Sequence, residues 1–411
     1  MNMNLIKLNP TFVFITISLF CCNYSVSAKE ESYLLQANTH SVLSEVHQDM
    51  EKFNHSEALK KLNKLVSSDK LKDYDYAVIY QIMGFAENGL GNFTNAAKYF
   101  IKALSFDALP KEVSHELYFS TAQLLIHIEK PKQGIKYLSK WFANESQPKA
   151  EAHILAATAY YYLEDYKQLI IHVEKAIPLS KKPPLYWYEL LLAGYYATKA
   201  FNNAAKILEQ IINKYPEKTD YWLQLAGTYQ RLEQEKKALA VYELAYSNEL
   251  LKKEDIIQLI RNYLYLEMPY KAAKILEKEM AIGDIDVNKK MLNMLVDSWL
   301  LAQENEKARS VFKEIIKKFN DDTARLRLGQ LYLESEEWIK ATETLNVKLE
   351  TDDKVLLSKI NLLLGIAEYH SNNLTKATRA FTNALSDKST EDQAIWWLKH
   401  LKRKTEVAQQ S

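Results

Sequence analysis

The sequence contains little glycine and little proline, with nine of each among 411 residues. A fold with many strands needs these residues at its turns, whereas long helices joined by short loops need few of them. Hydrophobic residues make up 47% of the chain and charged residues 26%, enough to bury a core and to keep the surface soluble. The composition therefore predicts a folded, all-α protein.

Cysteine is nearly absent, because the chain has only Cys21 and Cys22 and both lie in the apolar run "TFVFITISLFCC". A segment with one Lys and no acid precedes this run, and "NYSVSAKEE" follows it. In that second segment Val26 and Ala28 are the small residues that a signal peptidase accepts. We therefore predict a secretory signal peptide over residues 1–28, cleaved after Ala28, and a periplasmic protein.

Two alternatives remain open for this N-terminal segment. Its apolar run is shorter than the roughly 20 residues that a membrane-spanning helix needs, which disfavours an uncleaved anchor. Phe20 stands directly before Cys21, where a lipoprotein needs a small residue, so lipidation of Cys21 or Cys22 is also disfavoured. Cleavage after Ala28 would leave no cysteine, which would exclude disulfides, thiol catalysis and zinc–thiolate sites.

Neither sign of charge prevails in the predicted mature chain. Removing Lys7 from the 53 basic residues leaves 52 against 52 acidic residues. This balance gives no reason to expect nucleic acid or an anionic membrane as a principal partner. The most basic run is "KHLKRK", Lys399 to Lys404, and we interpret it as a solvated helix face or as favourable charge at a helix C-terminus.

Motifs that would indicate catalysis or cofactor binding are missing. The sequence has no Gly-rich phosphate loop, no Gly-x-Ser-x-Gly elbow and no His-Glu-x-x-His zinc helix. His40 and His47 lie seven residues apart without a third ligand nearby. The remaining candidates for a metal site are scattered over two predicted repeats, and nothing supports such a site: His115, His127, His153 and His172. We predict no metal, no cofactor and no enzymatic activity.

A helical pattern recurs when the chain is aligned on two small or apolar residues twelve positions apart. The ten pairs are Val46/Ala58, Gly84/Ala96, Ala122/Gly134, Ala157/Leu169, Leu192/Ala204, Ala226/Ala238, Ile260/Ala272, Val296/Ala308, Gly329/Ala341 and Gly365/Ala377. Successive second members lie 33 to 38 residues apart, around the period of the tetratricopeptide repeat. Small residues at both places allow two antiparallel helices to cross closely.

Larger residues at fixed distances from these pairs predict the packing faces. A large apolar residue follows the second member by four positions, as at Phe100, Leu208 and Phe381. An aromatic residue follows the first member by three positions in the central units, as at Tyr195 and Tyr263, and we expect it to wedge between helices.

The predicted fold is an all-α, tetratricopeptide-type helical-hairpin solenoid that winds as a right-handed superhelix. The array of ten repeats covers residues 29–388 without a linker that would divide it, and a capping helix and tail cover residues 389–411. The first unit is degenerate, with Val46 at the small position and Asp49 at the aromatic one. In the capping helix we expect Ile395, Trp396, Leu398 and Leu401 to face the last repeat, since a solenoid must cover its ends.

Tetratricopeptide arrays offer a concave surface lined by their first helices, suited to holding a peptide or a protein. In this family the lining positions lie one, four or five residues after the first small residue, and three before it. Carried onto this sequence, they predict a protein-binding groove at Phe119, His127, Tyr161, Tyr162, Glu189, Tyr196, Gln230, Arg231, Arg261 and Tyr265. Tyr and Arg are favoured at interface hot spots, but a chain with 26 Tyr also places some there by chance.

Three segments carry a more specific resemblance: "YWLQLAGTYQRLEQEKKALAVYELAY", "PYKAAKILEKEMAIGDI" and "WWLKHLKR". They resemble a family of exported bacterial tetratricopeptide proteins assigned to the TonB transport system. The resemblance implies a non-enzymatic periplasmic scaffold whose partners are TonB, ExbB or ExbD-type proteins or TonB-dependent receptors, with membrane contact only through these partners. Two alternatives remain: an envelope scaffold for outer-membrane or peptidoglycan assembly, and an enzyme whose site is dispersed over the repeats.

Overall fold

The computed structural model describes residues 33–67, 70–349 and 351–410 of the chain. The predicted signal peptide lies outside these residues, as do Cys21 and Cys22. Throughout the described part, regular structure is helical and no strand is formed. The chain divides between Pro216 and Glu217 into two compact units, which are described separately below.

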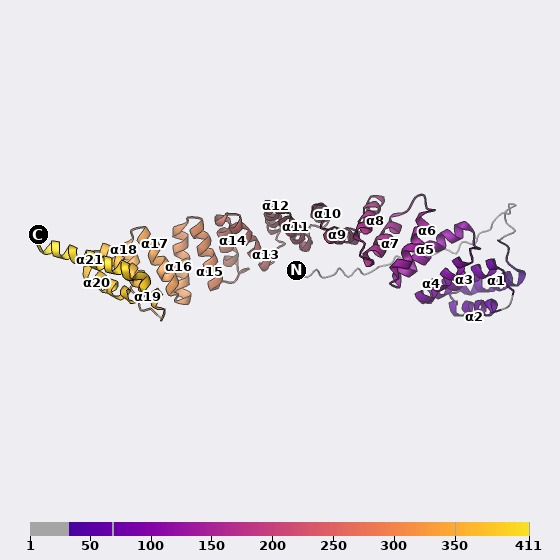
Figure 1. Cartoon of the computed structure of the whole chain (residues 1–411), viewed down its shortest axis with the longest axis horizontal. Helices are drawn as coiled ribbons and strands as arrows, with labels where there is room; N and C mark the ends of the chain where they lie inside the picture. The colour runs from indigo at the N-terminus through magenta and orange to yellow at the C-terminus, as the bar shows by residue number, and fades with distance from the viewer. Residues whose placement is uncertain (1–32, 68–69, 350, 411) are drawn as a thin grey trace. The chain divides into compact units, whose positions relative to one another are not determined.

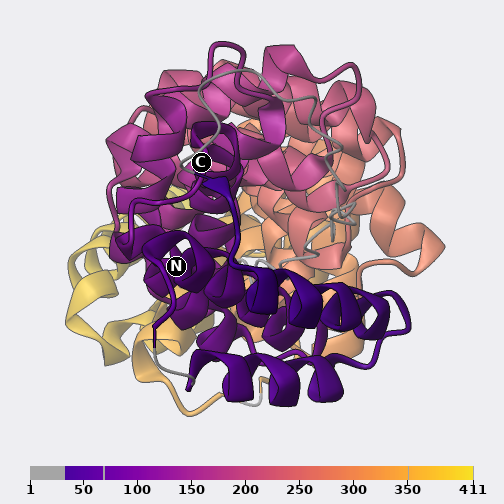
Figure 2. The ribbon, with the colours of Figure 1, turned by 90° about the vertical axis from the view of Figure 1, so that its right-hand side faces the viewer.

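In the described residues of the first unit, ten α-helices pair in sequence order into five hairpins (Figures 1 and 2). They are α1 (Ala37–Glu51), α2 (His55–Val66), α3 (Asp73–Gly89), α4 (Phe93–Ser105), α5 (Lys111–His127), α6 (Pro131–Phe142), α7 (Ala150–Tyr162), α8 (Tyr166–Leu179), α9 (Leu185–Ala197) and α10 (Phe201–Lys214).

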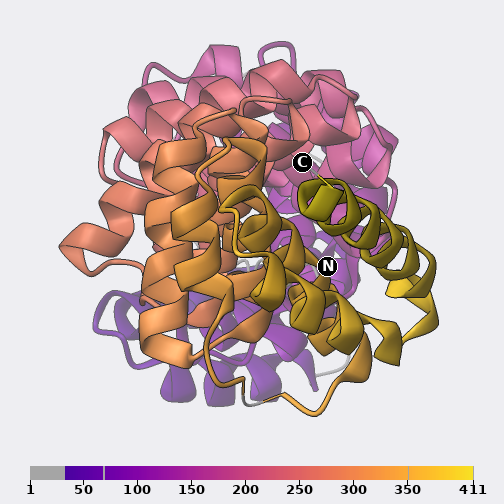
Figure 3. The same ribbon diagram turned by 90° about the vertical axis from the view of Figure 1, so that its left-hand side faces the viewer.

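The second unit contains five further hairpins and the C-terminal helix (Figures 1 and 3). Its helices are α11 (Thr219–Arg231), α12 (Glu235–Ser247), α13 (Lys253–Tyr265), α14 (Pro269–Ile282), α15 (Lys289–Leu301), α16 (Asn305–Phe319), α17 (Asp322–Glu334), α18 (Trp338–Leu345), α19 (Lys354–His370), α20 (Leu374–Asn383), the 3₁₀ turn η2 (Ala384–Ser386) and α21 (Lys388–Gln410). The predicted all-α, tetratricopeptide-type hairpin architecture is therefore confirmed.

Each hairpin is held at the small residues that the sequence pattern identified. All ten pairs are buried, including the less typical Val46/Ala58 and Ile260/Ala272. The large residues four positions after the second member are buried too, with Phe100, Leu208 and Phe381 almost inaccessible to solvent. Each second helix thus buries one continuous face against its partner, as the spacing of one helical turn predicts.

All ten hairpins turn in the same way. The residue seven positions after the first small residue has a positive φ, from Phe53 in the first hairpin to Asn372 in the last. The next residue donates its N–H to the carbonyl five positions earlier, over 2.7 to 2.9 Å, as from Gln234 to Tyr229. This pattern is the Schellman motif, which satisfies carbonyls at the end of the first helix. The degenerate first unit shares it.

Side chains also mark where several helices begin. Asp321 and Asp353 accept hydrogen bonds from backbone N–H groups in the first turns of α17 and α19. Pro131 and Pro269 stand at the first positions of α6 and α14, where no intrahelical N–H bond is lost.

The C-terminal helix α21 packs against α19 and α20 (Figure 3). Ala394 and Leu401 are buried there, and Trp397 and Leu398 pack against the same cluster. The prediction for Trp396 is wrong, since this side chain is 57% exposed. Positions 394, 397, 398 and 401 follow the three-to-four-residue spacing of one helix face, and Trp396 falls outside it.

Candidate protein-binding surfaces

The predicted groove residues of the first unit differ widely in exposure. Tyr162 is 44% exposed and His127 is exposed, with its ring 4.6 Å from that of Phe93. Phe119 is half-buried, and its ring lies 4.9 Å from Trp141 in the apolar core of the unit. Phe119 therefore contributes to packing more than to an open surface.

The other three groove residues of this unit are half-buried on the first helices α7 and α9. The Tyr161 ring lies against those of Tyr162 and Tyr166, and the Tyr196 ring lies 6.2 Å from Phe201. Glu189 lies two turns before Tyr196 on α9. These contacts fix the orientation of the rings, which lowers the entropy lost when a partner binds.

In the second unit the predicted residues lie on α11 and α13. Arg261 and Tyr265 are one helical turn apart on α13, both exposed, and Tyr265 is 72% exposed. Arg231 is exposed at the end of α11, whereas Gln230 is half-buried. A large aromatic ring beside a guanidinium provides the contact types that anchor protein interfaces.

A set of side-chain hydrogen bonds between successive hairpins was not predicted from the sequence. The Tyr195 hydroxyl on α9 donates to Glu174 on α8, and the Tyr263 hydroxyl on α13 donates to Glu243 on α12, each over 2.5 Å. Lys271 Nζ lies 3.0 Å from the same Glu243 oxygen. In the sequence, these hydrogen bonds could have been expected from a Glu that stands five positions after the second small residue of the preceding unit, at Glu174 and Glu243.

These contacts perturb the ionisable groups that form them. Burial, reinforced by the Glu243 carboxylate, raises the pKa of Tyr263. Burial alone would raise the pKa of Glu243, but hydrogen bonds from Tyr263 and Lys271 outweigh it and leave that pKa below its usual value. Tyr263 is therefore a neutral phenol that donates a hydrogen bond to the Glu243 carboxylate. This hydrogen bond links α12 to α13, which is a structural role.

Two histidines meet at the interface of α7 and α8. The Nδ1 atoms of His153 and His172 are 3.1 Å apart, so one donates and the other accepts. The ring of Phe142 packs against both imidazoles, and that of Tyr160 stacks on His172. Burial, followed by the repulsion of His153 and Lys175, lowers the pKa of His172 to about 4. Burial and Lys175 also lower the pKa of His153.

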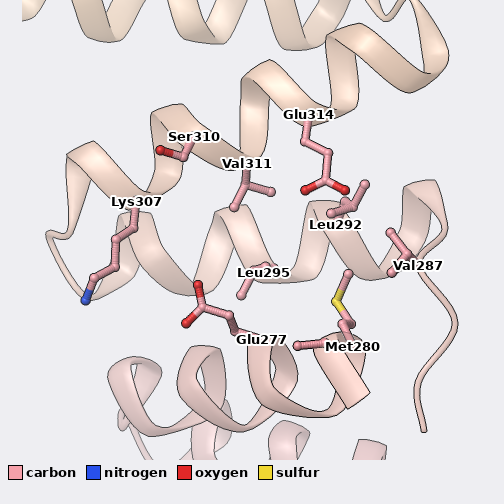
Figure 4. Close-up of a pocket in the computed structure, with 10 residues that line it drawn as sticks. Glu277, Met280, Val287, Leu292, Leu295, Lys307, Ser310, Val311 and Glu314 are labelled. Atoms are coloured by element: carbon pink, nitrogen blue, oxygen red, sulfur yellow. The ribbon is translucent and has the colours of Figure 1, made fainter. Parts of the chain in front are cut away.

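A pocket of about 390 Å³ lies over α15, between α14 and α16. Figure 4 shows Glu277 and Met280 on the side of α14, and Val311 and Glu314 on the side of α16. The pocket is lined by Glu277, Met280, Ala281, Val287, Leu292, Leu295, Lys307, Ser310, Val311 and Glu314. Its apolar lining, with the carboxylates of Glu277 and Glu314 beside it, can receive an apolar side chain of a partner whose sequence has a Lys or Arg next to that side chain.

Residues 33–67, 70–349 and 351–410 bring together no group of three or more His, Cys, Asp or Glu side chains that could hold a metal ion. Within the same ranges, every helix is too short or too polar to cross a bilayer.

No protein-family model matches the chain. It is 25% identical over 195 residues to the TPR repeat-containing protein YpiA of Bacillus subtilis (strain 168). This match covers 46% of the chain, and the chain spans 44% of the length of that relative. The relative and the hairpin geometry agree in identifying tetratricopeptide-type repeats.

Solved structures with similar helical hairpins include two with comparable coverage. The MamA protein is 19% identical, covering 43% of this chain and 92% of its own, with a TM-score of 0.35. YrrB, described as a TPR protein with an unusual peptide-binding site, is 18% identical, covering 48% of this chain and 100% of its own, with a TM-score of 0.34.

Proposed function

We propose that this chain is a non-enzymatic periplasmic scaffold that binds protein partners through the exposed residues of its first helices. The observation that carries the proposal is the presentation of Tyr and Arg side chains on a tetratricopeptide framework, most openly Arg261 and Tyr265 on α13. The framework is rigid where it is buried, so it can hold such residues in a fixed spacing.

The proposed partners belong to a TonB-type transport system: TonB itself, ExbB or ExbD-type proteins, or TonB-dependent receptors. The resemblance of residues 221–246, 269–285 and 396–403 to exported tetratricopeptide proteins of that system supports this assignment. The predicted signal peptide supports a periplasmic location. The scaffold would organise or modulate energy transfer between inner-membrane proteins and outer-membrane receptors.

Affinity capture from envelope extracts tests the partner class. We expect a TonB, ExbB/ExbD-type or receptor protein to be enriched over a control with unloaded resin. Enrichment of outer-membrane assembly or peptidoglycan-synthesis proteins in their place would assign the chain to the other class of envelope scaffold and refute the TonB role.

The binding surface is tested by replacing Tyr196, Arg231 and Arg261 together with Ala. Capture should fall about 10-fold or more, since such residues often contribute over 1 kcal/mol each at interfaces, while helicity by circular dichroism stays unchanged. The matched control replaces three exposed cations of second helices, Lys206, Lys274 and Arg379, with Ala. Equal capture by both triple variants would show that the interface lies elsewhere.

A further inference from the structure

The outward face of α21 carries an exposed indole among several cations. Trp396 is 57% exposed although it stands beside the packed Trp397. Its ring stacks on His400 at 5.4 Å and meets the edge of Trp397 at 4.9 Å. Lys399 and Arg403 follow at three and seven positions, so all three side chains lie on one helix face, opposite the buried Ala394 and Leu401.

Positive charge is concentrated on the same stretch of helix. Lys399, Lys402, Arg403 and Lys404 are exposed, and the sequence has no acid between Asp392 and Glu406. Lys404 Nζ lies 4.5 Å from the centre of the Tyr369 ring. The side chains described in this region offer Lys399 and Arg403 no ion pair, unlike Lys271 or Lys289 in the same unit. The chain as a whole is nearly neutral, so this is a local excess.

An exposed indole flanked by cations is the combination that binds the surface of an anionic bilayer. Tryptophan is enriched where headgroups meet acyl chains, because its ring is apolar and its N–H is polar. Each Lys or Arg near an anionic surface strengthens binding about five-fold. A helix with one packed face and one basic, Trp-bearing face lies in the plane of such a surface without crossing it.

We propose that the face formed by Trp396, Lys399 and Arg403, with Lys402 and Lys404 beside it, docks α21 onto anionic phospholipids. Trp396 enters the headgroup region, and the cations contact lipid phosphates. This contact is peripheral and direct, so it goes beyond the proposed scaffold function, in which membrane contact runs through partners. It also replaces the interpretation of "KHLKRK" as only a solvated face. An acidic protein would also satisfy the cations, and Trp anchors protein interfaces as well, so the experiments below include an outcome that distinguishes this partner from the lipid.

Flotation with lipid vesicles tests the proposal on the predicted mature chain, residues 29–411. The protein should float with vesicles of 30% phosphatidylglycerol in phosphatidylcholine and remain unbound with pure phosphatidylcholine. Half a molar NaCl should release it, because that salt screens charges beyond about 4 Å. Equal binding to both vesicle types, or none to either at low salt, would overturn the proposal.

A charge variant localises the effect. Lys399→Gln with Arg403→Gln removes two cations and should lower the partition coefficient about 25-fold. The control, Lys274→Gln with Lys317→Gln, makes the same charge change on α14 and α16 and should alter it less than about two-fold. Equal losses in the two variants would attribute binding to net charge, and unchanged binding in the first would exclude this face.

A Trp variant tests the apolar contribution. Trp396→Ala should weaken binding to phosphatidylglycerol vesicles and abolish most of the fluorescence quenching by brominated lipids, while thermal melting stays close to that of the parent. Undiminished quenching would place the bilayer against another Trp and refute this docking mode. Failure to bind vesicles together with retention on a polyglutamate resin would assign the face to an acidic protein instead.

Discussion

The hairpins of this chain stabilise themselves in two ways, and α19–α20 and α13–α14 illustrate the difference. In α19–α20 the side-chain hydrogen bond made by the residue three positions after the first small residue stays within the hairpin. In α13–α14 a principal contact reaches the hairpin before it. The two hairpins have the same turn and the same register, so the difference lies in a few side chains.

The α19–α20 hairpin is built around Gly365. The ring of Phe381 occupies the space beside it, so that a methyl group added at Gly365 would lie 2.5 Å from the ring. Glu368, almost fully buried, accepts a hydrogen bond of 2.7 Å from the side chain of Asn373 in the turn of the same hairpin. The α3–α4 hairpin repeats this arrangement with Gly84, Phe100, Glu87 and Asn92.

The α13–α14 hairpin has Ile260 where the other has Gly365, and Tyr263 where the other has Glu368. Tyr263 is buried, and its hydroxyl reaches Glu243 on α12 of the preceding hairpin. Lys271 on α14 contacts the same carboxylate. In repeat proteins, stability divides into terms within repeats and terms between neighbours. The type of residue three positions after the first small residue determines whether its hydrogen bond adds to stability within the hairpin, as Glu368 does, or between neighbouring hairpins, as Tyr263 does.

The largest effect is expected from filling the space beside Gly365. Gly365→Ala should lower the free energy of unfolding of the second unit by about 2–3 kcal/mol, since the added methyl overpacks the contact with Phe381. Urea unfolding monitored by circular dichroism measures this. The control is Gly227→Ala, where the added methyl meets open space within α11 and should stabilise by up to about 1 kcal/mol.

A double variant checks the cause assigned to that loss. Phe381→Leu in the Gly365→Ala background should recover part of the stability, because the smaller side chain leaves room for the methyl. A double variant no more stable than Gly365→Ala would refute the account of this hairpin.

The contact between hairpins is tested by Tyr263→Phe. Removing the hydroxyl leaves the half-buried Glu243 without one of its donors and should cost about 1–2 kcal/mol. Tyr332→Phe is the matched control, because the described residues provide no hydrogen-bond partner for that hydroxyl. Similar losses from both variants would mean that the hydrogen bond to Glu243 does not couple the hairpins.

In the α7–α8 hairpin the residue three positions after the first small residue is Tyr160, and its surroundings predict a stability that depends on pH. Tyr160 in α7 stacks on His172, whose pKa of about 4 lies below the value of about 6.5 expected in the unfolded chain. The unfolded chain then binds more protons between these values, so stability falls as pH drops. After allowance for partial exposure, we expect the unfolding free energy of the first unit to decrease by about 1 kcal/mol from pH 7 to pH 5.

Urea unfolding of His172→Gln at the two pH values provides the check. This variant should lose the larger part of the decrease, which His172 contributes, and keep the part that His153 contributes through its own lowered pKa. A His40→Gln control at an exposed site should keep the whole decrease, and an undiminished slope in His172→Gln would assign the effect to other groups.

The smallest effect concerns the turns that the two kinds of hairpin share. Glu233 holds a positive φ in the α11–α12 turn, so Glu233→Gly should relieve strain and raise the unfolding free energy by about 0.5 kcal/mol. Asn372 occupies the same place in the α19–α20 turn and tolerates this conformation better, so Asn372→Gly should change stability little. Thermal melting of the two variants distinguishes them.

The repeating pattern allowed much of the fold to be predicted, because small residues must recur wherever helices cross closely. The positive φ at each turn could not be predicted from glycine positions, because Gly91 is the sole glycine among the ten turn residues that adopt it. The buried Glu368 was missed because a carboxylate normally indicates a solvated face, and only the fold brings Asn373 to it.

The binding surfaces were less predictable than the framework. Phe119 matches a groove position, yet its ring packs against Trp141. Trp396 is hydrophobic, yet it points away from the repeat that α21 covers. In both cases the sequence pattern alone does not fix which way a large side chain faces, and the packing of neighbouring helices decides it. The ten groove positions otherwise remain predictions.

The constant turn has a consequence for how the length of this chain can vary. In every hairpin eleven residues lie between the two small positions, and the residue with positive φ always stands seventh among them. One inserted residue there would rotate the second helix by about 100° and turn its apolar face away from its partner. The repeat period nevertheless ranges from 33 to 38 residues, so all the variation in repeat length within this chain falls between the second small residue of one hairpin and the first small residue of the next.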